Sequence, residues 1–144
     1  MKVRRILATK GMGVMTIAPD RPIREAIGLL VGHNIGALVV VDDNGRPIGI
    51  LSERDIIRTA AVNEQVFDHS VADLMTHDVI TGTPQDDIHS LAHTMTEHRF
   101  RHIPIVEEGK LLGIISIGDI LKAQRDQYRG EIDTLETQIM ADDD

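Results

Sequence analysis

The sequence contains no cysteine and no tryptophan, and only one tyrosine and two phenylalanines among its 144 residues. Without cysteine, the chain has no disulfide, no thiolate chemistry and no cysteine-ligated metal site. Because aromatic residues make up only 2% of the chain, we expect a core built from aliphatic side chains. With 42% hydrophobic and 26% charged residues, the composition is typical of a globular protein.

Basic residues are scarce relative to acidic ones: 15 lysines and arginines stand against 23 aspartates and glutamates, for a formal net charge of −8. Non-specific binding of DNA or RNA needs clustered lysine and arginine, so we expect no nucleic-acid partner. No apolar run approaches the roughly 18–20 residues that a membrane-spanning helix needs, so we expect no membrane partner. Residues 1–7 are basic, but the apolar segment of a signal peptide does not follow them, and we expect a cytoplasmic protein.

What the chain does contain is an internal duplication. Residues 49–56 and 113–120 both read Gly-Ile-apolar-Ser-x-x-Asp-Ile. The similarity extends to the apolar segments 37–41 and 102–106, and one residue is lost in the turn that follows them. A turn is where a duplicated fold tolerates such a deletion most easily. Two related copies therefore fill most of the chain.

Hydrophobic periodicity predicts the order β-α-β-β-α in each copy. Apolar residues in 23–31 recur at helical spacing, and 37–41 is an unbroken apolar strand of the kind buried on both faces. The first copy is expected to have strands at 14–17, 37–41 and 48–51 and helices at 23–31 and 53–61, after an N-terminal strand or arm at 1–9. The second is expected to have a strand near Val79 and Ile80, a helix at 85–98, strands at 101–106 and 110–115, and a helix after Ser116.

A further helix is expected at the C-terminal end. Its residues Tyr128, Ile132, Leu135 and Ile139 follow the 4-3-4 spacing of an a/d seam of about two heptads. So short a seam is unstable alone, and we expect it to support a homodimer. The predicted boundaries are an N-terminal arm with the first repeat at 1–62, a linker at 63–70, the second repeat at 71–124, and the amphipathic helix with an acidic tail at 125–144.

The Ser-x-x-Asp pattern of each copy, at Ser52 with Asp55 and at Ser116 with Asp119, has two interpretations. As a capping box, the serine caps the helix and the acid three residues later reaches back to the serine amide. As a ligand site, the free amides of the helix N-terminus suit phosphate, and the carboxylate accepts hydrogen bonds from a ribose diol. A carboxylate has enough lone pairs to do both, so the pattern leaves the choice open.

The tandem β-α-β-β-α order, together with Val-Val-Asp-x-x-Gly-x-x-x-Gly-Ile-x-Ser-x-x-Asp in the first copy, resembles a pair of cystathionine-β-synthase (CBS) domains, often called a Bateman module. The second copy keeps the pattern in residues 102–106 and 113–119, and the resemblance spans residues 10–124. It implies an α/β fold of two CBS repeats related by a pseudo-twofold axis. It also implies a non-catalytic regulatory sensor without a cofactor, which binds AMP, ATP, NAD(H) or another adenosyl compound in clefts between the repeats.

Carried over residue by residue, the resemblance centres one cleft on Ser116 and Asp119 and the other on Ser52 and Asp55, with each acid on a ribose. Arg54 precedes the acid of its cleft, where a guanidinium is suited to phosphate. The resemblance implies that the cleft of Asp119 is lined by Lys10, Val14, Met15, Ile35, Gly36, Ala37, Arg101, His102 and Ile114. It implies that the cleft of Asp55 is lined by Ile50, Met75, Val79, Ile80, Phe100 and Arg101.

Several alternatives remain open. Arg99 flanks a strand, where an arginine either is solvated or contributes to an anion site. His89 and His93 lie one helical turn apart, but a third ligand at motif spacing is missing, so we expect no metal site. The sequence has no nucleophile elbow, no P-loop and no dinucleotide fingerprint. The rivals to a nucleotide sensor are an interaction module with vestigial clefts and an unrecognised nucleotide hydrolase.

Overall fold

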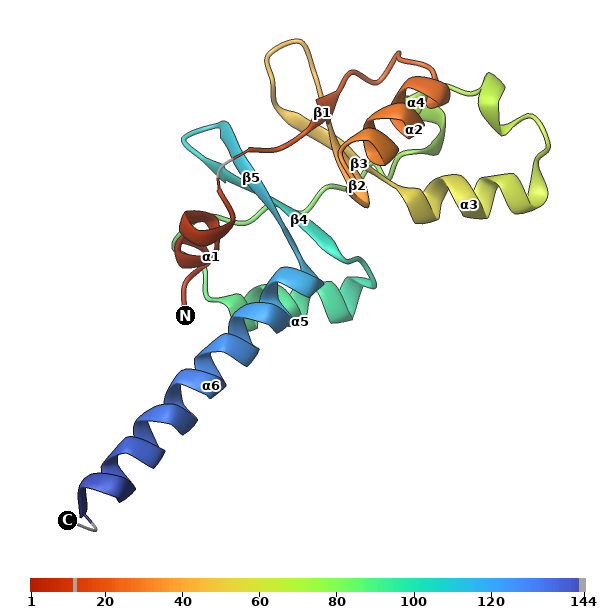
Figure 1. Cartoon of the computed structure of the whole chain (residues 1–144). Coiled ribbons are helices and arrows are strands. Elements are labelled where there is room, and N and C mark those ends of the chain that lie inside the picture. The colour runs from red at the N-terminus through yellow and green to blue at the C-terminus, as the bar shows by residue number, and fades with distance from the viewer. Residues whose placement is uncertain (12, 143–144) are drawn as a thin grey trace.

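The computed structural model describes residues 1–11 and 13–142 (Figure 1). Two lobes lie side by side, and a long helix extends away from them to the C-terminal end. The first lobe has a sheet in the order β1-β2-β3 and the second has a sheet of β4 and β5. The elements are α1 (Val3–Lys10), β1 (Thr16–Ile17), α2 (Ile23–Gly32), β2 (Ala37–Val41), β3 (Pro47–Ser52), α3 (Glu53–Val62), the 3-10 helix η1 (Val66–Asp68), α4 (Val71–Leu74), α5 (Ile88–His98), β4 (His102–Glu107), β5 (Lys110–Ser116) and α6 (Ile117–Asp142).

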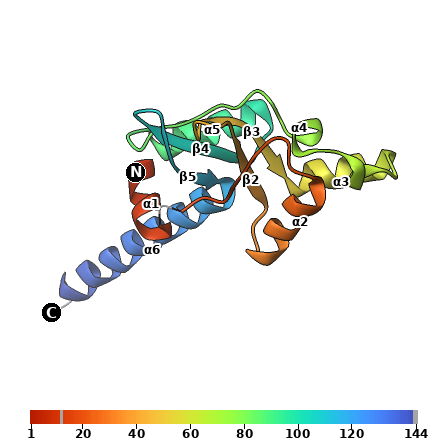
Figure 2. The ribbon, with the colours of Figure 1, turned by 90° about the horizontal axis from the view of Figure 1, so that it is seen from above.

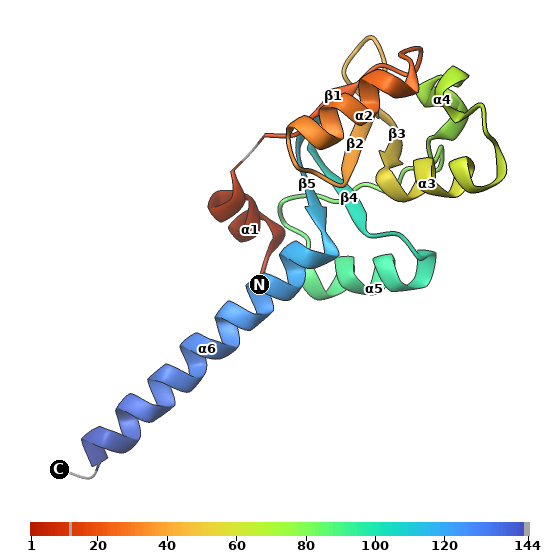
Figure 3. The same ribbon diagram turned by 45° about the vertical axis from the view of Figure 1, so that its right-hand side comes forward.

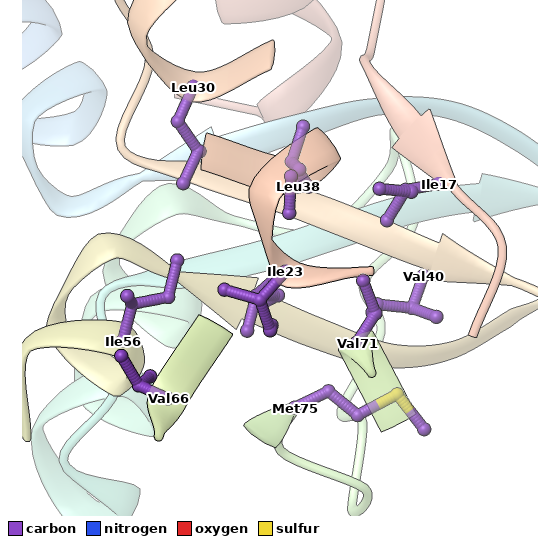
Figure 4. Packing of buried hydrophobic residues seen from close by; sticks show 11 residues of the cluster. Ile17, Ile23, Leu30, Leu38, Val40, Ile56, Val66, Val71 and Met75 are labelled. Carbon is purple, nitrogen blue, oxygen red and sulfur yellow. The ribbon is translucent and has the colours of Figure 1, made fainter. Parts of the chain in front are cut away.

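The first lobe is held together by an aliphatic core between its sheet and its helices (Figure 4). Strand β1 pairs in parallel with β2, and β2 pairs antiparallel with β3. Ile23 and Leu30 on the inner face of α2 meet Leu38 and Val40 of β2 in this core. Burying a side chain of this size stabilises the fold by about 1.5–3 kcal/mol. The core has no aromatic side chain, as the composition predicted.

The second lobe has its own core, and the N-terminal segment belongs to it. Residues 1–9 were expected to form a strand or arm, but α1 is a helix whose Val3, Ile6 and Leu7 are buried in this second core. These residues have the i, i+3, i+4 spacing of an amphipathic helix. The amide of Val3 donates to the carbonyl of Asp86 at 2.9 Å, and that of Ile88 donates to the carbonyl of Met1 at 3.0 Å.

The segment ahead of the second repeat makes the reciprocal contact, because Val71 of α4 and Met75 are buried in the first core. This exchange explains the glycine that opens each repeated motif. A Cβ on Gly49 would lie 2.5 Å from the sulfur of Met75, and a Cβ on Gly113 would lie 2.9 Å from Leu7. Each glycine in the middle of its strand therefore gives room to a segment that precedes the other repeat in the sequence but packs in the lobe of the glycine.

Two further predictions differ from the structure in detail. Val79 and Ile80 are not in a strand; Gly82 instead makes one parallel bridge to Ile105, at the place that Ile17 occupies opposite Val40 in the first lobe. The linker contains the short helix η1, which buries Val66 in the first core. The α/β class and the tandem order of the repeats are confirmed.

Helix α6 leaves the second lobe as a straight rod, with α1 beside its beginning (Figures 2 and 3). Its first turn packs on the core through Ile117 and Ile120. Every described side chain in residues 125–141 is exposed. Only the beginning of the helix is therefore part of the lobe.

Candidate functional site

Both Ser-x-x-Asp motifs form capping boxes where a strand passes into a helix. At the start of α3, the Ser52 amide donates to Asp55 Oδ2 at 2.9 Å, and the Asp55 amide donates to Ser52 Oγ at 3.2 Å. At the start of α6, the corresponding distances between Ser116 and Asp119 are 2.9 and 3.1 Å. In the described residues, neither acid has a hydrogen bond to Oδ1. The capping interpretation holds in both repeats, and each carboxylate keeps one oxygen for a ligand.

The two acids differ in their cationic partners. Lys10, in the last turn of α1, places its ammonium 2.7 Å from Asp119 Oδ2 and donates to the carbonyl of Ile114 at 2.8 Å. Burial raises the pKa of Asp119, but the hydrogen bonds from Lys10 and from the Ser116 amide outweigh it and hold that pKa below its usual value. In the part of the chain that the structure describes, Asp55 has no such ion pair.

His102 begins β4 close to this ion pair and to the first repeat. Burial lowers the pKa of its imidazole, and the nearby charge of Lys10 lowers the pKa further. Its Nε2 lies 3.9 Å from the place where a Cβ on Gly36 would stand. The neutral imidazole is therefore favoured, and in that form one ring nitrogen is a hydrogen-bond donor and the other an acceptor.

A cavity of about 710 Å³ lies between the two repeats and reaches both helix starts. Its size suits a ligand as large as a nucleotide. The walls are the first half of α3, the segment 76–80 before the second repeat, the end of α5 with the turn into β4, and the beginning of α6. The residues predicted for the ligand clefts that line it are Gly36, Ile50, Ser52, Arg54, Asp55, Val79, Ile80, Phe100, Arg101, His102 and Ser116.

Four arginines converge on this cavity in a chain that is acidic overall: Arg54 and Arg58 from α3, and Arg99 and Arg101 from the turn before β4. In the described part of the chain, none of them has a carboxylate within ion-pair distance. Arg99 is the left-handed C-cap of α5, at φ 59°, so α5 ends at the wall of the cavity. Guanidinium groups with free donors are suited to bind phosphate.

The remaining predicted residues lie elsewhere. Lys10 and Asp119 line a second cavity of about 910 Å³, between α1 and α6. Ile114 contributes the carbonyl that Lys10 binds. Val14 is half-buried outside both cavities. Met75 belongs to the first core, Met15 and Ile35 pack against it, and Ala37 is buried in β2.

The family model of the CBS domain matches residues 3–61 and 71–126. The chain belongs to the CBS-domain family. The resemblance noted in the sequence is therefore confirmed, and the cavity lies between two CBS repeats.

Relatives and solved structures agree with this assignment. An uncharacterized 17.7 kDa protein of Acidianus ambivalens is 40% identical over 128 residues, which cover 88% of this chain and 75% of that protein. A CBS-domain containing protein from Agrobacterium tumefaciens has a TM-score of 0.81 at 42% identity, over 86% of this chain and 99% of that one. The CBS domain pair of protein MJ0100 was solved with 5′-methylthioadenosine and S-adenosyl-L-methionine; its TM-score is 0.79 at 26% identity, over 88% and 98% of the two chains.

The chain spans between 39% and 76% of the length of its first curated relatives. Several of these CBS proteins are thus longer than this chain. Among the described residues, no helix combines the length and the apolar character that crossing a bilayer requires.

Sequence reasoning did not single out some residues that line the cavity between the CBS repeats. Arg58 had a usable signal, because it follows Arg54 by one helical turn and shares its face. Asp78 and His98 had no such signal in the sequence, since each lies on a segment whose path depends on the tertiary structure. For Arg99, the sequence allows both a solvated side chain and a contribution to an anion site. The other lining residues outside the predicted set are Glu53, Ile57, Thr76, Ile117 and Gly118.

The histidine pair on α5 has partners other than a metal. His89 Nδ1 lies 3.3 Å from the side-chain amide of Gln124, and His93 Nε2 lies 3.3 Å from Glu97. Residues 1–11 and 13–142 contain no group of three potential ligands that could hold a metal ion.

Proposed function

We propose that this CBS pair is a regulatory module that binds an adenine nucleotide or a related adenosyl compound, such as AMP, ATP or NAD(H), in the cavity beside Asp55. The module binds its ligand without chemical turnover and acts by a change in an interface. The observation that carries the proposal is the position of Asp55, with no ion-pair partner among the described residues, on the same cavity as four arginines. Complexes of the MJ0100 domain pair with two adenosyl compounds support this ligand class.

In this proposal, Asp55 Oδ1 accepts hydrogen bonds from the ribose hydroxyls. The first amides of α3 and the guanidinium of Arg54 bind the phosphates, because the helix N-terminus carries a partial positive charge. The apolar side chains of Val79 and Ile80 contact the base. Phosphate is favoured over an uncharged adenosyl group because the arginines on the cavity form no ion pair with a carboxylate of the described residues.

At Asp119, the carboxylate already has a cationic partner within the chain. The ammonium of Lys10 lies 2.7 Å from Oδ2, so the charge of this carboxylate is partly neutralised and a ribose on its free Oδ1 is held less strongly. We therefore assign the main site to the cavity of Asp55 and a weaker site to Asp119. This order agrees with the motifs themselves, since the position of Arg54 is taken by Gly118 in the second repeat.

Thermal unfolding with a panel of AMP, ADP, ATP, NAD and adenosine tests the proposal. A ligand that binds only the folded state raises the Tm as its concentration rises above Kd. We expect a rise for the phosphate-bearing ligands, and a much smaller one in Asp55→Asn. Asp73→Asn is the matched control, because Asp73 forms the same capping box at the start of α4 and does not line the cavity. Equal shifts in wild type and Asp55→Asn would reduce Asp55 to a capping residue.

The proposal includes a homodimer as the working form. An interface that responds to the ligand requires a second surface, and α6 offers an exposed apolar one. Sedimentation with and without nucleotide measures whether the ligand changes the association. An unchanged association constant would mean that the signal passes by another route.

A further inference from the structure

The apolar side chains on the projecting part of α6 form one continuous face. Tyr128, Ile132, Leu135 and Ile139 are between 53% and 62% exposed, and each of their described neighbours in 125–141 is exposed as well. In the part of the chain that the structure describes, nothing covers this face. A helix gains most of its stability by packing an apolar face, so this one requires a partner.

We propose that the partner is α6 of a second copy, packed antiparallel in one register. Tyr128 and Leu135 occupy d positions, and Ile132 and Ile139 occupy a positions. In this register Ile132 packs against Leu135 of the partner subunit and Tyr128 packs against Ile139 of the partner subunit. The twofold axis repeats both contacts, which gives four apolar layers without a polar residue among them.

Charge complementarity selects this register. Arg129 and Glu136 are the e positions that flank the seam, and both are exposed. In the antiparallel register, Arg129 faces Glu136 of the partner subunit, and the twofold axis repeats the pair. The g positions are Glu131 and Gln138, which face each other without repulsion. Flanking charges of this kind set the orientation of paired helices.

A parallel, in-register pair is disfavoured by the same residues. It places Arg125 at an a position, against Arg125 of the partner subunit, inside the seam. It also brings Glu131 next to Glu136 of the partner subunit on both sides. Like charges at these positions oppose association.

The partner helix belongs to a second copy of the chain, because residues 128–139 contain both residues of every proposed contact. A twofold interface is self-complementary, and residues 128–139 supply Arg129 and Glu136 at positions that the axis exchanges. The antiparallel arrangement places the two bodies at opposite ends of the paired helices. The register rests on the homodimer proposed above, but it does not depend on nucleotide binding.

Reversing the charge of one residue distinguishes the two orientations, because it weakens an antiparallel dimer and strengthens a parallel one. Glu136→Arg turns both Arg129–Glu136 pairs of the antiparallel register into repulsive pairs, whereas it relieves the Glu131–Glu136 repulsion of a parallel one. Because two exposed ion pairs are lost and each contributes a factor of about 1.4–5 to the affinity, we expect the dimer Kd to rise about two- to thirtyfold. Arg129→Glu has the same effect, and Arg129→Glu combined with Glu136→Arg restores the wild-type Kd. Sedimentation equilibrium in low salt measures these constants.

Asp133→Arg is the matched control, because it makes the same charge change as Glu136→Arg at an exposed position outside the seam. Tighter association of Glu136→Arg would show a parallel pair and overturn the proposal. A monomeric wild type, or double variants that do not recover, would also overturn it. Loss of nucleotide binding in Asp55→Asn, with the dimer Kd unchanged, separates this result from a failure of the ligand site.

Discussion

The ammonium of Lys10 lies 2.7 Å from Oδ2 of Asp119, although the two residues are separated by most of the chain. Lys10 ends a helix that precedes the first repeat, and Asp119 caps a helix of the second repeat. The pair therefore joins the N-terminal segment to the second lobe at one of the two motif acids. It makes the two repeats unequal, because no ion pair of this kind is present at Asp55 among the described residues.

Removal of the Lys10 ammonium should open the second site. Lys10→Met keeps the aliphatic stem and removes the charge that competes for Asp119. We expect wild type to bind one nucleotide per chain tightly and Lys10→Met to bind a second one with similar affinity, as measured by isothermal titration calorimetry. Asp119→Asn in the Lys10→Met background should abolish the added site. A stoichiometry that stays at one would show that the ion pair does not gate binding.

The arginines of the cavity should make affinity depend on phosphate. In Arg58→Ala, we expect the affinity for ATP to fall about tenfold or more, because a hydrogen bond to a charged group contributes about 1.5–3 kcal/mol. The affinity for adenosine should stay within a factor of about two, since adenosine makes no contact with a phosphate group. Arg46→Ala, in an exposed turn, is the control for lost positive charge. Equal losses for ATP and adenosine would contradict a phosphate-binding role.

The motif glycines should be sensitive to a single methyl group. Gly49→Ala forces a Cβ to within 2.5 Å of Met75 and 3.1 Å of the Thr76 carbonyl, and overpacking of this kind destabilises by about 1–3 kcal/mol. Gly113→Ala should cost less, because only a flexible Leu7 methyl stands in the way. Urea unfolding measures both. Gly28→Ala, on an open face of α2, should instead stabilise the protein by up to about 1 kcal/mol.

The half-buried imidazole of His102 should make stability depend on pH. Its folded-state pKa is lowered by burial, so as pH falls from about 6.5 toward that pKa, the unfolded chain takes up a proton that the folded chain does not. Stability is therefore lost as pH falls through this window, and His102→Gln should flatten the curve there. The lowered pKa of Asp119 affects stability in a separate window, at pH values below about 3.8, where stability is also lost as the pH falls. An unchanged slope in His102→Gln would show that another group titrates.

The repeat pattern predicted the elements whose signals are local. Ser52 with Asp55 and Ser116 with Asp119 were recognisable as helix starts, and both form caps. The apolar segment 37–41 was predicted as a buried strand and is one. Periods and caps are properties of neighbouring residues, so one sequence is enough to find them.

The parts that could not be predicted depend on segments distant in the chain. The helical spacing of Val3, Ile6 and Leu7 was present in residues 1–9, but only the second lobe gives that face something to cover. The burial of Met75 against Gly49 and the ion pair of Lys10 follow from the same exchange of segments between lobes. Tertiary contacts of this kind override local preference.

A crystal structure of the chain with ATP tests the central claim most directly. The account predicts one well-ordered nucleotide per chain in the cavity between the repeats, with ribose hydroxyls on the Asp55 carboxylate and phosphates on Arg54 and Arg58. A nucleotide bound elsewhere, or an empty cavity at saturating ATP with Asp55 facing only solvent, would contradict it.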